Sequence, residues 1–297
     1  MHKNPNPNNH SDSEGTHPSQ LSLWDLASTE QGYCALYDLD FSTAEKSFED
    51  ALFGGFIHNN EYTLVIETCH YWNEQQSILI KRGQTQLANL LNFIDAFKNF
   101  TFHTSMKMLR LRLLEYIAEL LPEAAPSDID VTIEIFDLLI ADGKYHYAKN
   151  LIECMAQQWP DNLLIKFAYA EAHWYLGEYH ASNLIYLNLL LHQPYNIIIS
   201  RISNPSLHQL ILQYGATQAT VYGYIFGIFK MSKLPDSILY QDDQHQCAIE
   251  CIHHILESEN AIKAGDTYKS VSHRKQLYQL SPEITKVYMN YVKKHQL

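Results

Sequence analysis

The sequence predicts an all-α protein in which antiparallel helix pairs stack as an α-solenoid, closed by a C-terminal helical cap. Only 11 Gly and 10 Pro occur in 297 residues, and the abundance of Leu, Ile, Ala, Gln and Glu favours long helices over a turn-rich β fold. Apolar residues recur at spacings of three and four, as the buried face of a helix requires. Residues 142–160 are echoed 34 positions later by residues 176–194, which indicates a repeated structural unit.

Residues 1–20 are expected to form a disordered tail. They contain no aromatic or branched apolar side chain, so they cannot bury enough surface to order themselves. They also lack the apolar stretch of a secretory signal. The five Cys show no close disulfide spacing, which is typical of a reducing compartment. We therefore expect a cytoplasmic location.

Residues 21–126 are predicted to form helical pairs. Amphipathic helices are expected at 61–80, at 87–97 and at 106–121, because apolar positions recur there with helical spacing. No strand-like alternation or Asn-Gly hairpin signal occurs in this region. Near its start, small and aromatic residues follow a helix–turn–helix pattern, at Gly32, Phe41, Ala44, Phe48 and Ala51.

Residues 127–196 carry two copies of one helix–turn–helix unit. Ser127 is a good N-cap for the first copy, and Asp128 and Asp130 lie in its first turn. Gly143 and Gly177 each stand between two helical runs, where a helix must stop and reverse. One pair cannot cover its own apolar faces, so it must stack on neighbours. Further matches at the same offset are Tyr145 with Tyr179, His146 with His180, Pro160 with Pro194, and Asn162 with Asn196.

These two copies resemble tetratricopeptide repeats, which are 34-residue helix–turn–helix units. The resemblance covers about a quarter of the chain, and the pattern around Gly32 is a weaker third match. The matching positions are Ala170 at the close approach of two helices, Ala148 and Ser182 early in the second helix, Tyr186 one turn later, and Pro160 and Pro194 at the end. The departures are Phe136, Met155 and Leu189 where the family has small residues, and Thr132 and Lys166 where it has tryptophan. Phe136 is expected to hold its helix pair further apart.

Residues 197–297 are predicted to form a C-terminal helical region without the 34-residue phase. Helices are expected at 206–214, 216–231, 244–259 and 264–280, and a last one begins at Ser281-Pro282-Glu283. The apolar run 221–229 is too short to cross a bilayer, so a buried helix is favoured there over a membrane span. The charge-free helix at 216–229 is also a candidate surface for self-association. A structural, self-assembling protein that forms a homo-oligomer through this helix is therefore an alternative function.

The net charge of −12 argues against a general nucleic-acid binder, which needs a basic face. A metal-binding protein or an enzyme that uses the His/Cys cluster at 245–254 is an alternative function. Cys247, Cys251 and His254 lie near one helix face, but the ends of this set are about 10 Å apart along the helix. One ion cannot reach both ends. No phosphate-binding loop or HExxH motif occurs, and no cofactor or catalytic residue is assigned.

The leading functional hypothesis is a non-enzymatic scaffold or adaptor for protein–protein interaction. The resemblance implies that the first helix of each repeat lines a concave groove for a partner peptide or helix. Carried over position by position, the groove comprises Asp130, Ile133 and Asp137, then Leu164, Phe167, Glu171 and Trp174. This face is apolar and acidic and lacks the Lys, Arg and Asn that clamp a carboxylate, so a basic or amphipathic partner is expected. Alternatively, Phe167 and Trp174 are only core between repeats.

Overall fold

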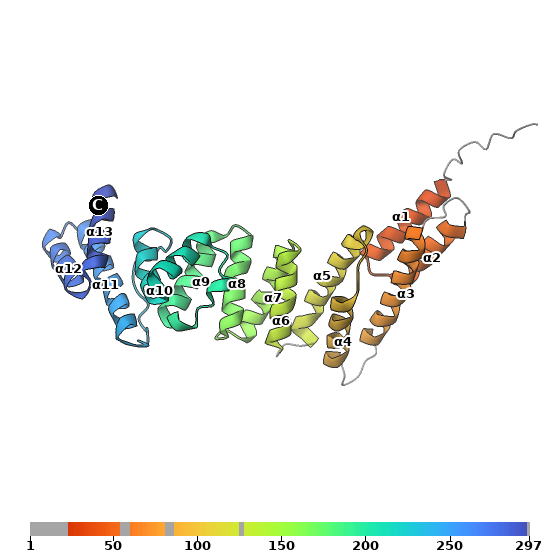
Figure 1. Cartoon of the computed structure of the whole chain (residues 1–297), viewed down its shortest axis with the longest axis horizontal. Helices are drawn as coiled ribbons and strands as arrows, with labels where there is room; N and C mark the ends of the chain where they lie inside the picture. Colours follow the sequence, from red (N-terminus) through yellow and green to blue (C-terminus); the bar gives the residue numbers. More distant parts are fainter. Residues whose placement is uncertain (1–22, 54–59, 81–85, 125–127, 296–297) are drawn as a thin grey trace, which may run out of the picture. The chain divides into compact units, whose positions relative to one another are not determined.

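A computed structural model describes residues 23–53, 60–80, 86–124 and 128–295 (Figure 1). All regular secondary structure in these residues is helical, which confirms the all-α prediction. The expected tail at 1–20 lies outside the described residues. Within the described part, no helix is long and apolar enough to span a membrane. By compactness the chain divides into two units, one up to Leu113 and one from Leu114 onward. The ranges 21–126, 127–196 and 197–297 are based on the repeat pattern instead.

The N-terminal unit contains α1 (Leu23–Tyr37), α2 (Phe41–Phe53), α3 (Asn60–Ile80), α4 (Gln86–Asn99), η1 (Thr104–Met106) and the first turns of α5 (Lys107–Ala124). Gly32 on α1 lies against the ring of Phe48 on α2, where an added Cβ would come within 2.8 Å of the ring. The small residue at this position therefore allows the two helices to approach closely. Trp72 of α3 is fully buried, and aromatic rings surround it, those of Tyr71, Phe93, Phe100 and Phe102.

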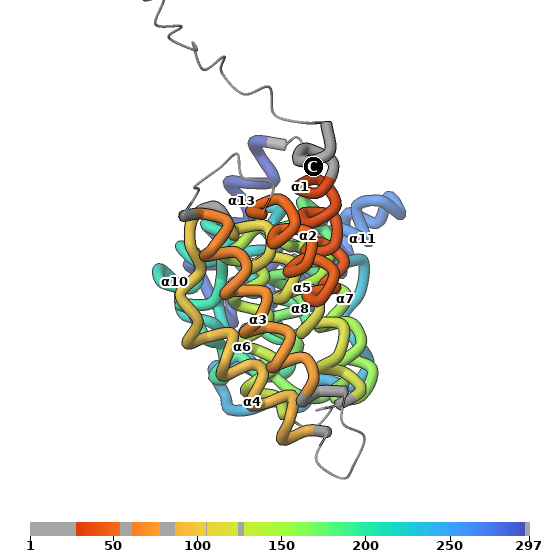
Figure 2. The backbone as a smooth tube through the Cα atoms, turned by 90° about the vertical axis from the view of Figure 1, so that its right-hand side faces the viewer, coloured from red at the N-terminus to blue at the C-terminus, as the bar shows by residue number. Residues whose placement is uncertain are grey.

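The C-terminal unit begins with two helix pairs whose bounds repeat at the predicted offset. The first pair is α6 (Ile129–Ala141) and α7 (Tyr145–Gln158), and the second is α8 (Leu163–Tyr175) and α9 (Tyr179–His192). Each bound in the second pair lies 34 residues after its counterpart in the first. Consecutive helices pack against each other, and α6 also packs against α8. Figure 2 traces the backbone of these helices in a view turned by 90° from that of Figure 1. The helix pairs predicted from sequence are therefore present at this period.

The helix starts repeat as well, with one correction to the sequence analysis. Asp128, rather than Ser127, caps α6, because its Oδ1 accepts the N–H of Val131. Asn162 caps α8 in the same way by accepting the N–H of Ile165. Since Asp and Asn side chains satisfy otherwise unpaired N–H groups, both first helices begin at matched positions.

The turns between paired helices are closed by glycine in the left-handed conformation. Gly143 has φ 75° and Gly177 has φ 77°, a region that non-glycine residues enter only at a cost. The N–H of Lys144 donates to the carbonyl of Leu139 at 2.8 Å, and that of Glu178 to His173 at 2.9 Å. These hydrogen bonds end α6 and α8 by giving donors to backbone carbonyls that have no partner within the helix.

The remaining helices are α10 (Pro205–Ile225), α11 (Asp243–Lys263), α12 (Thr267–Leu280) and α13 (Pro282–His295), with short η2 (Pro194–Asn196) and η3 (Ile199–Arg201) before them. Gly215, at φ 79°, interrupts α10. The helix predicted to reach residue 231 ends at Ile225, because left-handed Gly227 closes it. The helix predicted from 264 starts at Thr267 instead, because left-handed Gly265 ends α11 and Asp266 caps α12.

One apolar core joins the helices from α8 to α13. Ala170 of α8 and Tyr186 of α9 are both fully buried in it, as their places in the repeat predict. Helices α6 and α7 pack together less extensively than α8 and α9. This difference fits the expectation that Phe136, which stands where the next repeat has Ala170, separates the first pair. The helices α7 and α9, the second helices of the two pairs, therefore pack behind the face formed by α6 and α8.

Candidate functional site

The candidate site is the face formed by α6 and α8, which carry all seven residues predicted for the groove. Asp130, Ile133 and Asp137 lie on α6, and their counterparts 34 positions later, Leu164, Phe167 and Glu171, lie on α8. Because α6 and α8 pack side by side, matched positions of the two helices can line one surface.

Two hollows lie on this face. The first, of about 430 Å³, is lined by Asp130, Ile133, Glu134, Asp137, Leu138, Leu164 and Arg201. The second, of about 270 Å³, includes Asp137, Phe167 and Glu171 in its lining, together with Phe136, Ile140, Ala168, Tyr175, Ser200, Arg201 and Ser203. Six of the seven predicted residues therefore border the hollows, and Asp137 and Arg201 border both. Trp174 borders neither hollow and instead packs on the ring of Tyr179, with centroids 4.5 Å apart.

Glu171 and Phe167 serve the interior of this face. Phe167 is fully buried against the ring of Tyr186. Glu171 is 6% exposed and accepts hydrogen bonds from the hydroxyl of Tyr186 at 2.5 Å and from the N–H of Ser203 at 3.1 Å. Burial, followed by the negative charge of Glu171, raises the pKa of Tyr186, so its hydroxyl remains a donor. This carboxylate anchors the segment that follows α9 onto α8.

Arg201 lines both hollows, and the sequence analysis did not predict it as a residue of this face. Its guanidinium reaches back 64 residues to Asp137, with Nη2 at 3.0 Å from Oδ2 and Nη1 at 3.3 Å from Oδ1. The one signal in the sequence is its isolation, since no other Lys or Arg occurs between Lys166 and Lys230. The chain thus supplies a cation of its own to the face that was predicted to take a basic partner.

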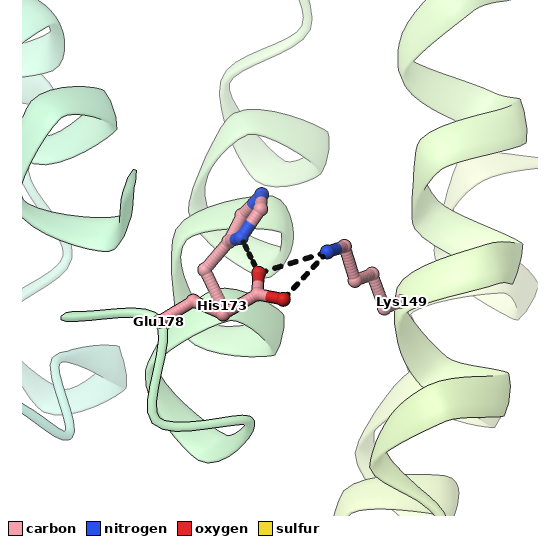
Figure 3. A network of polar contacts seen from close by, with 3 residues as sticks. All are labelled: Lys149, His173 and Glu178. Atoms are coloured by element: carbon pink, nitrogen blue, oxygen red, sulfur yellow. Dashed lines mark hydrogen bonds and ion pairs between the residues drawn. The ribbon is translucent and has the colours of Figure 1, made fainter. Parts of the chain in front are cut away.

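A second polar cluster lies at the junction of the two repeats (Figure 3). Lys149 of α7 donates to both carboxylate oxygens of Glu178, at 3.1 and 2.8 Å, and His173 of α8 bonds the same carboxylate. The hydrogen bond from Lys149, followed by that from His173, lowers the pKa of Glu178. The same bond to Glu178 raises the pKa of Lys149. Both side chains are therefore charged at neutral pH.

The position of this cluster in the repeat indicates a structural role. Lys149 and Glu178 correspond, 34 residues earlier, to Glu115 and Lys144, which also form an ion pair, at 2.5 Å. The charges are exchanged but the two positions are the same. A bond that recurs with reversed sign suits a joint between units better than an acid–base site, which needs particular groups in particular places.

The His/Cys cluster at 245–254 divides between different neighbours. Cys251 is fully buried, and burial, followed by the charge of Cys247, raises its pKa to about 12, so its thiol is protonated. His254 contacts His273 of α12, with their Nδ1 atoms 3.1 Å apart. His245 is 1% exposed and accepts the N–H of Gln241. Among the described residues, no three His, Cys, Asp or Glu side chains are grouped so that they could hold a metal ion.

The charge-free segment 216–229 lies largely inside the C-terminal unit. Val221, Tyr222, Ile225 and Phe229 are buried in the core, whereas Phe226 is 50% exposed. Gly223 makes room for the ring of Phe229, because an added Cβ would lie 2.5 Å from it. Most of this apolar surface is therefore used for packing within the chain.

Comparison with known proteins adds no relationship: no protein-family model, no curated protein and no solved structure matches the chain.

Proposed function

We propose that this protein is a non-enzymatic interaction scaffold, a solenoid of tetratricopeptide-type helix pairs whose α6–α8 face binds a basic or amphipathic segment of a partner protein. The observation that carries the proposal is the Asp137–Arg201 pair, in which the chain's own guanidinium is bound between two hollows of this face. The proposal places the protein in the cytoplasm, where its five free cysteines stay reduced.

The equal spacing of the helix pairs supports the repeat assignment. Helix bounds, N-caps and left-handed glycines all recur after 34 residues between α6–α7 and α8–α9. A period shared by caps, turns and helix lengths is expected when units stack on one another with the same geometry. Such stacking leaves the first helices side by side, where an extended ligand can contact several of them.

The chemistry of the first hollow supports the choice of partner. Asp130 and Asp137 are exposed carboxylates, and between them lie the apolar side chains of Ile133 and Leu164. Apolar anchors beside a charged rim are the usual means by which a groove holds an amphipathic helix or peptide. A partner with a Leu or aromatic residue next to Arg or Lys complements both features.

A selection experiment tests the proposal. A random dodecapeptide library displayed on phage is selected against the full chain, and the recovered peptides are sequenced. We expect enrichment of Arg or Lys adjacent to large apolar residues. The recovered peptides are then titrated against D130K/D137K, which reverses two charges in the hollow, and against E153K/D161K, which reverses two exposed carboxylates elsewhere in the same unit.

The proposal requires that binding be lost in D130K/D137K and retained in E153K/D161K. Equal binding to both variants, or recovery of peptides without basic residues, would contradict it. Glu171 is left unchanged, because a lysine there would bury a positive charge that faces two hydrogen-bond donors, the hydroxyl of Tyr186 and the N–H of Ser203. Loss of binding in such a variant would report unfolding rather than recognition.

A further inference from the structure

The Asp137–Arg201 pair is exposed, whereas the hydrogen bonds of Glu171 beside it are buried or partly buried. The Arg201 side chain is 31% exposed and that of Asp137 is 52% exposed, whereas Glu171 beside them is buried. Ion pairs between exposed side chains are weak because water and salt screen them. The guanidinium can therefore leave Asp137 for solvent at little cost.

The backbone that carries Arg201 is held on both sides, independently of its side chain. Ser203 donates its N–H to Glu171, and its hydroxyl lies 2.9 Å from that of Tyr175. Ile202 is buried at 6% exposure, and Asn204 is buried at 3% exposure and caps α10. The segment thus stays on α8 while only the Arg201 side chain changes place.

The contact has the geometry of arginine recognition. Both terminal nitrogens of the guanidinium face both oxygens of Asp137, a bidentate arrangement that an ammonium group cannot reproduce. The positive charge of Arg201 also lowers the pKa of Tyr186, against the stronger effects of burial and Glu171 that raise it. The charge of the guanidinium at Asp137 therefore also affects the buried hydroxyl of Tyr186.

We infer that Asp137 is an arginine subsite of the groove, and that Arg201 occupies it as an internal ligand which a partner's arginine displaces. This inference rests on the proposed function and specifies its ligand. A partner guanidinium that binds the same two oxygens of Asp137 replaces the lost ion pair, and the side chain of Arg201 moves out into the solvent. The partner must first break the Asp137–Arg201 pair. It therefore binds more weakly than it would bind to the same groove without Arg201, and the difference in binding free energy is the free energy of that pair.

The test uses N-acetyl-arginine amide as the probe and N-acetyl-citrulline amide as its uncharged isostere, with binding followed by ligand-observed NMR. Wild-type chain is compared with R201M, which keeps an apolar stem but removes the competing charge. We expect R201M to bind the arginine probe up to about fivefold more tightly than wild type, the range that an exposed ion pair allows. Neither protein should bind the citrulline probe.

The double variant D137N/R201M should no longer bind the arginine probe. Circular dichroism and thermal unfolding check each fold, and R201Q serves in place of R201M if the latter unfolds. Equal affinity of wild type and R201M, absence of binding to R201M, or undiminished binding to D137N/R201M would overturn the inference. The library selection decides the proposed function separately, since peptides that depend on Asp130 and Asp137 but bind R201M no more tightly would preserve the function and refute the competition.

Discussion

Lys149 and Glu178, 2.8 Å apart, join α7 to the turn after α8 at the two positions where Glu115 and Lys144 join α5 to the turn after α6. The sign of each charge is exchanged between the two junctions. The position of His173, which also bonds Glu178, is occupied in the earlier repeat by Leu139. The repeat therefore determines the two positions at which a junction forms. The residue types at these positions determine which of the two carries the positive charge.

This relationship predicts that the junction tolerates inversion when its neighbour is changed too. K149E alone should lower the melting temperature, because it places two carboxylates together. K149E/E178K should recover part of the loss, since the new lysine meets His173. K149E/H173L/E178K reproduces the earlier junction and should recover most of the rest. Thermal unfolding of the four proteins measures this, and a triple variant no more stable than K149E would refute the equivalence of the two junctions.

A substitution at Gly177 tests the left-handed turn. An added Cβ at Gly177 would meet nothing within 4 Å, so G177A changes only the backbone preference. We expect a loss of about 1–2 kcal/mol in the free energy of unfolding, measured by urea titration. G177N should lose less, because asparagine enters the left-handed region more readily. Equal losses for the two variants would indicate a cause other than φ.

The contact between His254 and His273 predicts a dependence of stability on pH. Burial, followed by the charges of His253 and His273, lowers the pKa of His254, and burial also lowers that of His273. Glu250 and Glu257 oppose the shift at His254. Because the folded state favours the neutral rings, their contribution is complete above the ordinary pKa of 6.5 and is lost as the pH falls through the lowered value.

Urea titrations at about pH 7.5 and about pH 5.5 measure this contribution. Wild type should lose stability between these values, and H254Q/H273Q should lose less because glutamine does not titrate. Part of the loss should persist, since burial also lowers the pKa of His245. H146Q, which changes an exposed histidine, is the control. The same loss in H254Q/H273Q as in wild type would exclude the two rings as its source.

The repeat was predictable where local chemistry determines it. Gly143 and Gly177 needed only their spacing and the cost of a left-handed backbone to be identified as turns. Gly215 interrupts α10 between the two predicted helices, at 206–214 and 216–231, so that break was predicted correctly. Gly227 and Gly265 adopt the same left-handed conformation but stand outside the 34-residue phase, so one helix was predicted too long and the other too early. Asp128 and Ser127 are both good caps, and the sequence alone does not decide between adjacent candidates.

The positions of the seven predicted residues on α6 and α8 followed from the repeat, but their contacts did not. Asp137 was placed correctly on the face, but its partner Arg201 lies 64 residues away, beyond any periodic pattern. Glu171 borders the second hollow, and its hydrogen bond from the N–H of Ser203 could not be predicted from the repeat. Trp174 was assigned to the groove from its register, and packing against Tyr179 decides its place. Such tertiary contacts depend on where a distant, irregular segment comes to lie.

The central claim is that a partner segment lies on the α6–α8 face, and photo-cross-linking tests it most directly. A benzophenone amino acid replaces Leu164, which lines the first hollow, or Leu184 of α9, which is 55% exposed and outside it. Each protein is irradiated with a library-selected peptide at equal occupancy. We predict that the peptide cross-links at position 164 and not at position 184. Cross-linking at 184 alone, or equally at both positions, would contradict the assignment of the groove.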